Sequence, residues 1–236
     1  MVASERMEAL GGFAFRWRGI LVPALLLVPA LALGTTVHDS LPGLGRSSGW
    51  SCAALGLLGF AMRGLTVGFV RRGSSGRNTR GQKAAALNVR GTYSMLRNPL
   101  YVANTLMVGG VILVLGSWII FAVSMAGILA LYGSIVRVEE AFLADRFGEA
   151  YRAYARRTPR FVPRPWLWRK PDSPWSWRML VRREHDAAFA LLVGLAAART
   201  YRVALLGGRL WDPGWALALA AGLLVWLVVK FLKKRT

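Results

Sequence analysis

The sequence predicts an all-α polytopic membrane protein with about six transmembrane helices. Two observations carry this prediction: 55% of the 236 residues are hydrophobic, too many for an ordinary soluble domain, and the apolar residues gather in long runs. A spanning helix needs roughly 20 residues. The runs are residues 19–37, 50–70, 100–115, 118–136, 187–206 and 214–231. The third run is short, and Arg199 and Arg202 interrupt the fifth, so these two are the weakest.

The runs divide the chain into three parts. Residues 1–70 are expected to form an N-terminal transmembrane hairpin. Residues 71–165 are expected to hold a basic loop, a hairpin that turns at about Gly116 and Ser117, and an amphipathic cytoplasmic helix. Residues 166–236 would form a Trp-rich linker and a C-terminal hairpin. We expect that linker to anchor the chain at the membrane interface, and a lid over a lipid entry route is the alternative.

The formal net charge of +20 has a membrane explanation. With the spans placed as above, the Lys and Arg clusters fall on one side of the membrane, and the opposite loops hold only Arg46 and Arg209. This positive-inside pattern predicts that both termini are cytoplasmic. It also predicts attraction to anionic lipids and argues against nucleic-acid binding. The high Arg, Ala and Gly content favours a bacterial inner membrane.

Disulfide and metal chemistry find little support in the composition. Cys52 is the only cysteine, which excludes an intrachain disulfide, and His38 and His185 are the only histidines. A zinc site draws on several such residues, so we expect no metal site.

Beyond residue 136 the fourth span is expected to continue as a cytoplasmic helix. Residues at steps of three or four share one face of a helix, and here they are Glu140, Leu143, Phe147, Tyr151 and Tyr154. An amphipathic helix on the bilayer surface explains the apolar members of this stripe. It does not explain Glu140 on the apolar face or Glu139 at its edge.

An acidic pair at the membrane boundary needs a partner, because a carboxylate at the bilayer centre costs roughly 2.5–3.5 kcal/mol. Arg97 is the best candidate, since a hairpin brings the start of the third span near the end of the fourth. It can form a structural salt bridge or hold a ligand carboxylate. Pro99 suits the first turn of a helix, which would leave Arg97 and Asn98 facing a ligand. Tyr93 and Tyr101 flank this corner, either as interface anchors or as rings around a cation.

These residues resemble a known family. Gly-x-Tyr-x-x-x-Arg-Asn-Pro-x-Tyr at 91–101, an apolar hairpin, and Glu-Glu-x-x-Leu-x-x-x-Phe-Gly-x-x-Tyr-x-x-Tyr at 139–154 are similar to the integral-membrane methyltransferases. That group includes isoprenylcysteine carboxyl methyltransferase and the phospholipid N-methyltransferases. The resemblance covers about residues 78–163. It implies S-adenosylmethionine as methyl donor, bound at the cytoplasmic face, and a lipophilic or amphiphilic acceptor.

The resemblance also assigns residues. The positions that match the family's cofactor-binding residues are Leu87, Asn88, Tyr93, Asn98, Pro99, Leu100, Tyr101 and Glu139. Arg97 and Glu140 belong to the same motif and are the candidate catalytic residues. Two positions depart from the family. Asn98 replaces its histidine and cannot act as a base, and Ile135 replaces an arginine that the carboxyl methyltransferases carry, which weakens a prenylcysteine substrate.

Two other functions stay open. Membrane reductases that use NADPH resemble this group in architecture, and Arg97 with the basic loop could receive a phosphate. Alternatively, the change to Asn98 marks a non-catalytic family member. The oligomeric state and the methyl acceptor are not predicted.

Overall fold

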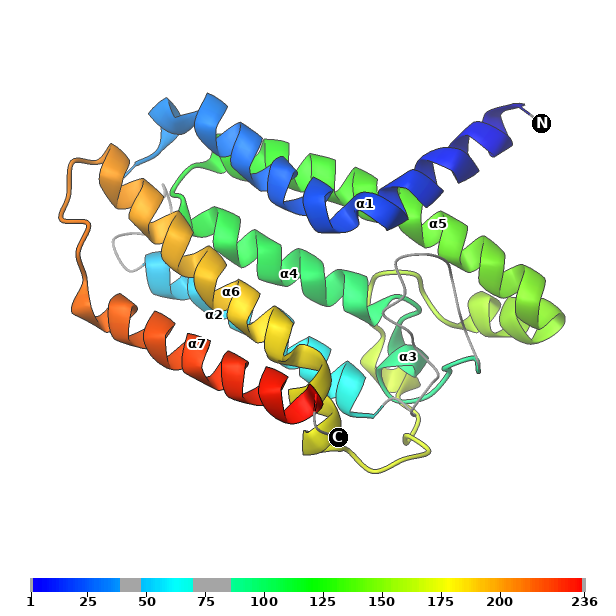
Figure 1. The fold of residues 1–236 in the computed structure, drawn as a ribbon. Helices are drawn as coiled ribbons and strands as arrows, with labels where there is room; N and C mark the ends of the chain where they lie inside the picture. The colour runs from blue at the N-terminus through cyan, green and yellow to red at the C-terminus, as the bar shows by residue number, and fades with distance from the viewer. Residues whose placement is uncertain (1, 39–47, 70–85, 235–236) are drawn as a thin grey trace.

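The computed structural model describes residues 2–38, 48–69 and 86–234, which fold into helices joined by loops (Figure 1). In chain order the helices are α1 (Val2–Ala32), α2 (Ser48–Gly68), α3 (Thr92–Met95), α4 (Pro99–Val114), α5 (Trp118–Arg157), α6 (Trp177–Leu205) and α7 (Pro213–Lys234). Short 3-10 helices lie at Gly34–Thr36 and Pro165–Leu167. Within these ranges there is no strand, only an isolated bridge between Gly91 and Arg169, so the predicted all-α class is confirmed.

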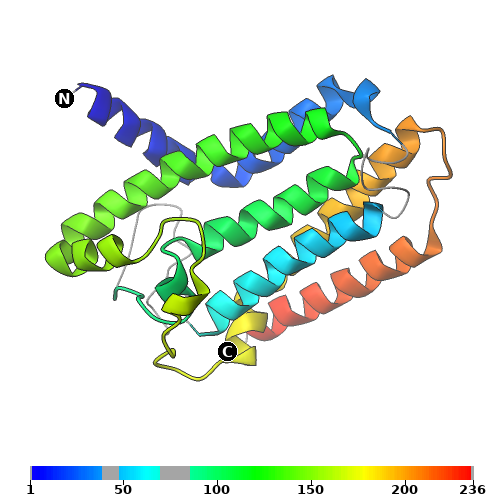
Figure 2. The same cartoon turned by 180° about the vertical axis from the view of Figure 1, so that it is seen from behind.

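The long helices have the length and composition of membrane spans. Five of them, α1, α2, α5, α6 and α7, are long and apolar enough to cross a membrane. The sixth, α4, has 16 apolar residues and is about 24 Å long at 1.5 Å per residue. The six helices run side by side, as Figures 1 and 2 show from opposite sides. The protein is therefore a polytopic membrane protein, and its third apolar run is short, as the sequence predicts.

The core is centred on α4, which contacts α2, α5 and α6. Ala103 and Ile112 on α4 are fully buried, whereas α7 packs on α6 and has no buried residue. The exposed leucines of α7, such as Leu217 and Leu224, suit contact with lipid chains. A functional site connected to the core would therefore involve α4.

Glycine lets α2 and α4 approach closely. A Cβ atom at Gly110 would lie 2.5 Å from the backbone nitrogen of Gly56. One at Gly59 would lie 2.6 Å from the carbonyl oxygen of Ala103. Small residues at helix contacts are the usual basis of tight packing between membrane helices. α4, which begins at the motif residue Pro99 with Asn98 as its N-cap, is thus packed tightly on α2.

The turn between α4 and α5 lies where the sequence places it. Gly116 has φ +79°, a conformation that glycine adopts readily, and the Ser117 side chain accepts a hydrogen bond from the Ile120 N–H. Pro99 occupies the first turn of α4, as predicted.

One element differs from the prediction. The sequence predicts a continuous amphipathic helix beyond residue 136. This prediction is wrong, because Gly148 (φ 53°, ψ −127°) breaks the helical backbone within α5. There the chain turns back, and residues 149–157 form a helical stretch that returns toward α3 (Figures 1 and 2). Glycine enters this conformation because it has no Cβ atom. Tyr151 and Tyr154 therefore do not extend the face that begins at Glu140.

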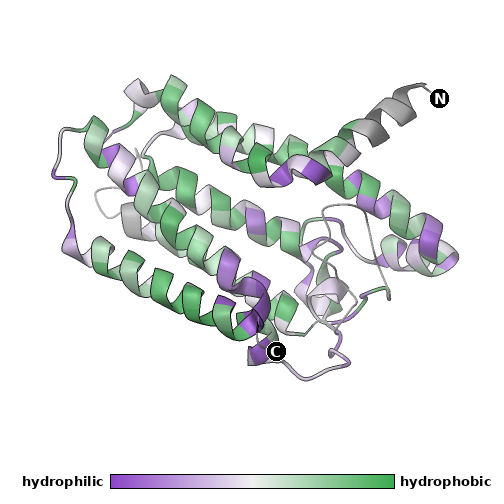
Figure 3. Ribbon diagram, in the orientation of Figure 1, coloured by the Kyte–Doolittle hydropathy of each residue, from purple (hydrophilic) through white to green (hydrophobic). Residues whose placement is uncertain are grey.

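A second difference concerns α6, which begins at Trp177, well before the apolar run at 187–206. The Ser176 side chain caps it by accepting a hydrogen bond from the Met179 N–H. Its first turns are hydrophilic, and so is the neighbourhood of α3, whereas most of the helical bundle is hydrophobic (Figure 3). Both termini lie toward this hydrophilic end (Figure 1).

Candidate functional site

The candidate site lies at the hydrophilic end of the bundle, where α3, the start of α4 and the second half of α5 meet (Figures 1 and 3). Backbone hydrogen bonds hold these segments together. The Arg97 N–H donates to the Pro159 carbonyl at 2.8 Å, and the Arg164 N–H donates to the Met95 carbonyl at 3.1 Å. The segment after α5 is thus fixed against the motif at residues 91–101.

The Trp-rich linker closes over the other side of α3. The Gly91 N–H donates to the Arg169 carbonyl at 2.9 Å, and the Arg169 N–H donates to the Ser94 hydroxyl at 2.9 Å. Gly91 has φ +61°, which only glycine adopts without strain. Trp166 remains 77% exposed, in keeping with an interfacial residue.

Glu140 is the centre of a buried polar network. Its Oε2 atom lies 2.7 Å from Arg160 Nη2 and 3.4 Å from Arg97 Nη1. Its Oε1 atom accepts a hydrogen bond from Asn98 Nδ2 at 3.0 Å. The predicted ion pair between Arg97 and the acidic pair is therefore confirmed at Glu140. Two cations and one amide thus offset the cost of burying the negative charge of this carboxylate.

The environment of the Asn98 side chain differs from the prediction. Its side chain was predicted to face a ligand, but it is buried and donates to Glu140 Oε1 and, at 3.3 Å, to the Arg160 carbonyl. Within this arrangement the amide holds the loop after α5 against the start of α4.

Glu139 has a different environment from its neighbour. Tyr101 donates a hydrogen bond to its Oε1 atom at 2.9 Å, and within the described part of the chain no Lys or Arg forms an ion pair with it. The Tyr101 ring packs edge-on against Tyr132, with centroids 5.2 Å apart. Glu139 is half-buried. A carboxylate in this position, beside tyrosine rings, suits a positively charged ligand.

Two buried polar atoms near the network, Arg97 Nε and the Tyr151 hydroxyl, form no hydrogen bond of full geometry within the described residues, although the Arg97 guanidinium acts on that hydroxyl as a hydrogen-bonding partner. Tyr151 is 4% exposed, and the Arg97 guanidinium acts electrostatically on its hydroxyl. Because incomplete hydrogen bonding of buried donors costs free energy, a ligand oxygen that accepts from them would be favourable here.

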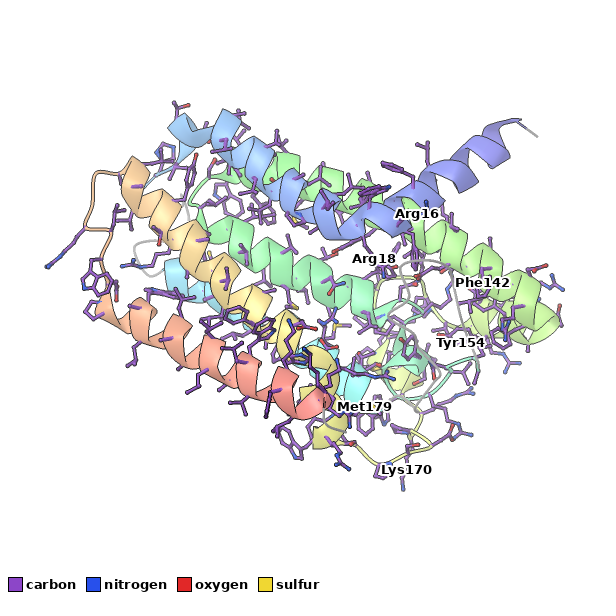
Figure 4. All side chains as sticks on the ribbon, in the orientation of Figure 1. Arg16, Arg18, Phe142, Tyr154, Lys170 and Met179 are labelled. Carbon is purple, nitrogen blue, oxygen red and sulfur yellow. The ribbon has the colours of Figure 1, made fainter. Side chains whose placement is uncertain are left out.

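Tyr93 ties α3 to the rest of the site. The Tyr154 hydroxyl donates to the Tyr93 carbonyl at 2.8 Å, and Figure 4 shows Tyr154 beside α3. Burial, and then the nearby Glu139 charge, raise the pKa of the Tyr93 phenol to about 12. The Arg63 and Arg183 guanidinium groups act on it in the opposite direction. The phenol is therefore a hydrogen-bond donor throughout the physiological pH range, and charged groups on α2, α5 and α6 act on it.

Most of the residues assigned from the sequence come together. The contacts above join Tyr93, Arg97, Asn98, Tyr101, Glu139 and Glu140. Pro99 is buried at the start of α4, followed by half-buried Leu100. Leu87 and Asn88 lie half-buried in the segment that leads to Gly91.

Sequence reasoning missed four partners. They are Arg63, Tyr132, Arg160 and Glu184. Arg160 reaches Glu140 only because the chain reverses direction at Gly148. The spacing of residues in its basic stretch does not indicate this contact. Arg63 could have been found as a charge inside an apolar run, since such charges are costly unless paired.

The comparisons with known proteins agree with the geometry. Residues 53–150 match the sequence model of the phospholipid methyltransferase family. The chain is 37% identical over 120 residues to the cobalt-zinc-cadmium resistance protein CzcN of Cupriavidus metallidurans. It is 36% identical over 124 residues to the nickel-cobalt-cadmium resistance protein NccN of Alcaligenes xylosoxydans xylosoxydans. No solved structure matches the chain.

These alignments cover 51% and 52% of this chain and 55% and 57% of the relatives. The chain thus spans about half the length of the curated relatives it matches. Within the residues that the structure describes, no group of three or more His, Cys, Asp or Glu side chains could hold a metal ion.

The family match contains both carboxylates and their partners Arg97 and Tyr101. It supports methyl transfer at a membrane in general, and it confirms the resemblance that the motifs indicate. Residues 53–150 of this chain, called the family region below, are therefore similar to the phospholipid methyltransferase family.

Proposed function

We propose that this protein is an integral-membrane methyltransferase that uses S-adenosylmethionine to methylate a lipophilic or amphiphilic acceptor. The observation that carries the proposal is the contrast between adjacent carboxylates. Glu140 is compensated by Arg97, Arg160 and Asn98. Among the described residues Glu139 accepts one side-chain hydrogen bond, from Tyr101, and the Arg18 charge acts on it without forming an ion pair. Glu139 is therefore the carboxylate that remains for a cationic ligand.

The residues present fit this cofactor. The sulfonium and ammonium groups of S-adenosylmethionine are cations, which suit Glu139 and the rings of Tyr93 and Tyr101. Its carboxylate suits two buried donors, Arg97 Nε and the Tyr151 hydroxyl, which form no hydrogen bond of full geometry within the described residues. When bound, the cofactor supplies a methyl group already activated by the positive sulfur.

The chain's own residues then have mainly positioning roles. Methyl transfer to an aligned acceptor needs orientation and exclusion of water more than acid–base chemistry. Arg160 and Asn98 fix Glu140 and with it the start of α4, so that Tyr101 presents its hydroxyl to Glu139. Asn98 cannot move a proton, so an amine or hydroxyl acceptor would rely on Glu139 to accept one.

The proposal includes location. We place the protein in a bacterial inner membrane with both termini and the site at the cytoplasmic face. The positive-inside pattern supports this orientation, as does the position of both termini at the site's end of the bundle (Figure 1). Exposed Trp166 and Trp177 would lie among lipid headgroups, where anionic lipids attract the neighbouring arginines.

The test is direct binding of S-adenosylmethionine and NADPH to the full-length protein in detergent. Glu139→Gln is compared with wild type, and Glu149→Gln, an exposed carboxylate on the same helix, is the matched control. We expect saturable S-adenosylmethionine binding to wild type and the control, weakened at least tenfold in Glu139→Gln. Transfer of a labelled methyl group into membrane lipid extracts would then identify the acceptor.

Other outcomes change the assignment. Binding of NADPH alone would favour a membrane reductase. If neither cofactor binds to folded protein, the change to Asn98 marks a family member without catalysis, and the proposal is wrong.

A further inference from the structure

A second buried ion pair joins the family region to a helix outside it. Arg63 on α2 donates from Nε to Glu184 Oε2 at 2.6 Å and from Nη2 to Glu184 Oε1 at 3.1 Å. Its remaining nitrogen, Nη1, donates to Asn104 Oδ1 on α4. Glu184 lies on α6, after the matched residues 53–150. All three nitrogens of the guanidinium are thus fixed by partners on two other helices.

Stability does not account for such a pair. The side chains of Arg63 and Glu184 are 13% and 2% exposed, so both charges have lost most of their hydration. Replacing a buried ion pair by packed apolar residues is often neutral or stabilising, because desolvation offsets the attraction between the charges. A two-bonded pair does fix direction, since the planar guanidinium can meet the carboxylate in few orientations.

The fixed guanidinium is connected to the candidate site through α4. Its partner Asn104 lies one helical turn after Tyr101, the donor to Glu139, and residues three apart share a helix face. Its charge also acts on the Tyr93 phenol. Arg183, the residue before Glu184, also acts on Tyr93. The first turns of α6, where Figure 4 labels Met179, lie at the same end of the bundle as α3.

We propose that Glu184 is a positioning residue for the methyl-transfer site. It holds the Arg63 guanidinium against Asn104, one turn of α4 from Tyr101, so that α6 forms a required side of the site although it lies outside the family region. This inference rests on the proposed function. It predicts that S-adenosylmethionine binding depends on the presence of both charges and on which of the two positions carries which charge. Side-chain volume alone should not be sufficient.

The test separates packing from positioning with two double variants in the full-length protein. Arg63→Met with Glu184→Leu removes both charges and keeps similar volume, and Arg63→Glu with Glu184→Arg restores a pair with the charges exchanged. The matched control exchanges the charges of Arg199 and Asp212, an ion pair at the other end of α6. Thermal unfolding in detergent and S-adenosylmethionine binding are measured for each.

We expect all three variants to unfold within a few degrees of wild type. Affinity for S-adenosylmethionine should fall at least tenfold in both Arg63–Glu184 variants and stay unchanged in the Arg199–Asp212 control. Wild-type affinity in either Arg63–Glu184 variant would overturn the positioning role and leave the proposed function standing. Absence of binding to wild type would overturn both.

A single variant covers the case in which the double variants do not fold. Arg63→Lys keeps the charge but cannot form two parallel bonds to Glu184. Weakened binding at an unchanged unfolding temperature, by about three- to tenfold, supports positioning. Unchanged binding in this variant overturns it.

Discussion

At the scale of single residues, two neighbouring carboxylates do different work because their surroundings differ. Glu140 faces two arginines and an amide in a buried network, and Glu139 faces a tyrosine hydroxyl. The first arrangement stabilises the fold at the start of α4. The second leaves negative charge for a ligand. Substitution should therefore affect stability at one position and binding at the other.

We expect Glu140→Gln to lower the free energy of unfolding by about 2 kcal/mol or more, because it leaves the Arg97 guanidinium buried without a counter-charge. The loss should be smaller than the roughly 3–5 kcal/mol of a fully buried pair, since Arg160 is 44% exposed. Denaturant unfolding in detergent measures it. Glu139→Gln, the control, should change stability by less than about 1 kcal/mol, and equal losses at the two positions would contradict this reading.

Asn98 gives a second prediction at this scale. Asn98→Asp replaces the donor to Glu140 by a like charge, so we expect a lower unfolding temperature and weaker S-adenosylmethionine binding. Asn98→His keeps a ring N–H that can donate, and it restores the residue of the related family. It should bind at least as well as wild type. A variant with aspartate that is as stable as the one with histidine would show that the contact with Glu140 is unimportant.

At the scale of elements, the reversal inside α5 builds the site. The chain after Gly148 supplies Tyr154, which bonds to Tyr93, and Arg160, which bonds to Glu140. A straight helix would carry both residues away from α3. The backbone conformation of one glycine thus decides whether Tyr154 reaches Tyr93 and whether Arg160 reaches Glu140.

We expect Gly148→Ala to destabilise the protein by about 1–3 kcal/mol, because an L side chain is strained at φ 53°, ψ −127°. A Cβ atom there would meet nothing within 4 Å, so the cost arises from the backbone alone. Gly133→Ala is the matched control: it is helical on the same α5, also has no neighbour within 4 Å, and should be neutral or slightly stabilising. Unfolding and S-adenosylmethionine binding are measured together, and a Gly148 variant that behaves like the control would exclude a role for the reversal.

The same element shows what sequence can and cannot predict. Apolar run length indicated the spans, and Pro99 and Gly116 marked the ends of α4, because these signals are local. The pairing of Arg97 with Glu140 also followed, since a hairpin brings its two ends together. Gly148 gave no comparable signal, because a glycine within a helical pattern is compatible with a straight helix.

Contacts between residues far apart in the sequence were also not predicted. Arg63 and Glu184 are 121 residues apart, and no periodicity connects α2 to α6. The first turns of α6 are rich in charged residues, so hydropathy assigned them to the linker although they are helical. Such contacts depend on how the helices pack, which a single sequence does not reveal.

At the scale of the whole molecule, one end of the bundle is hydrophilic and carries the candidate site, and the other end is formed by short turns. Hydrophilic residues gather around α3 and the start of α6, and the turns between α4 and α5 and between α6 and α7 lie at the opposite end (Figures 1 and 3). In the orientation proposed above, the hydrophilic end faces the cytoplasm. A cofactor made in the cytoplasm would then reach the site directly.

This orientation predicts the activity of reporter fusions. Alkaline phosphatase, which is active only outside the cytoplasm, should be active when fused after Gly208, between α6 and α7. It should be inactive when fused after Lys170, on the linker beside α3 (Figure 4), or at the C-terminus. The reverse pattern of activity would invert the topology and remove the proposed cytoplasmic site.

The C-terminal hairpin gives the last prediction, because its two helices differ in their connection to the core. α7 packs on α6 through contacts such as the hydrogen bond from Trp226 Nε1 to Asp186, and has no buried residue. α6 is bound to α2 and α4 by the Arg63–Glu184–Asn104 cluster. A chain ending after Leu206 should therefore unfold at a lower temperature yet bind S-adenosylmethionine within about threefold of wild type. The interactions of Tyr93 and Glu139 within the described residues come from other helices than α7. A chain ending before Trp177 should lose binding, because it lacks Glu184 and Arg183. Binding that survives the second truncation in folded protein would show that the family region is sufficient by itself.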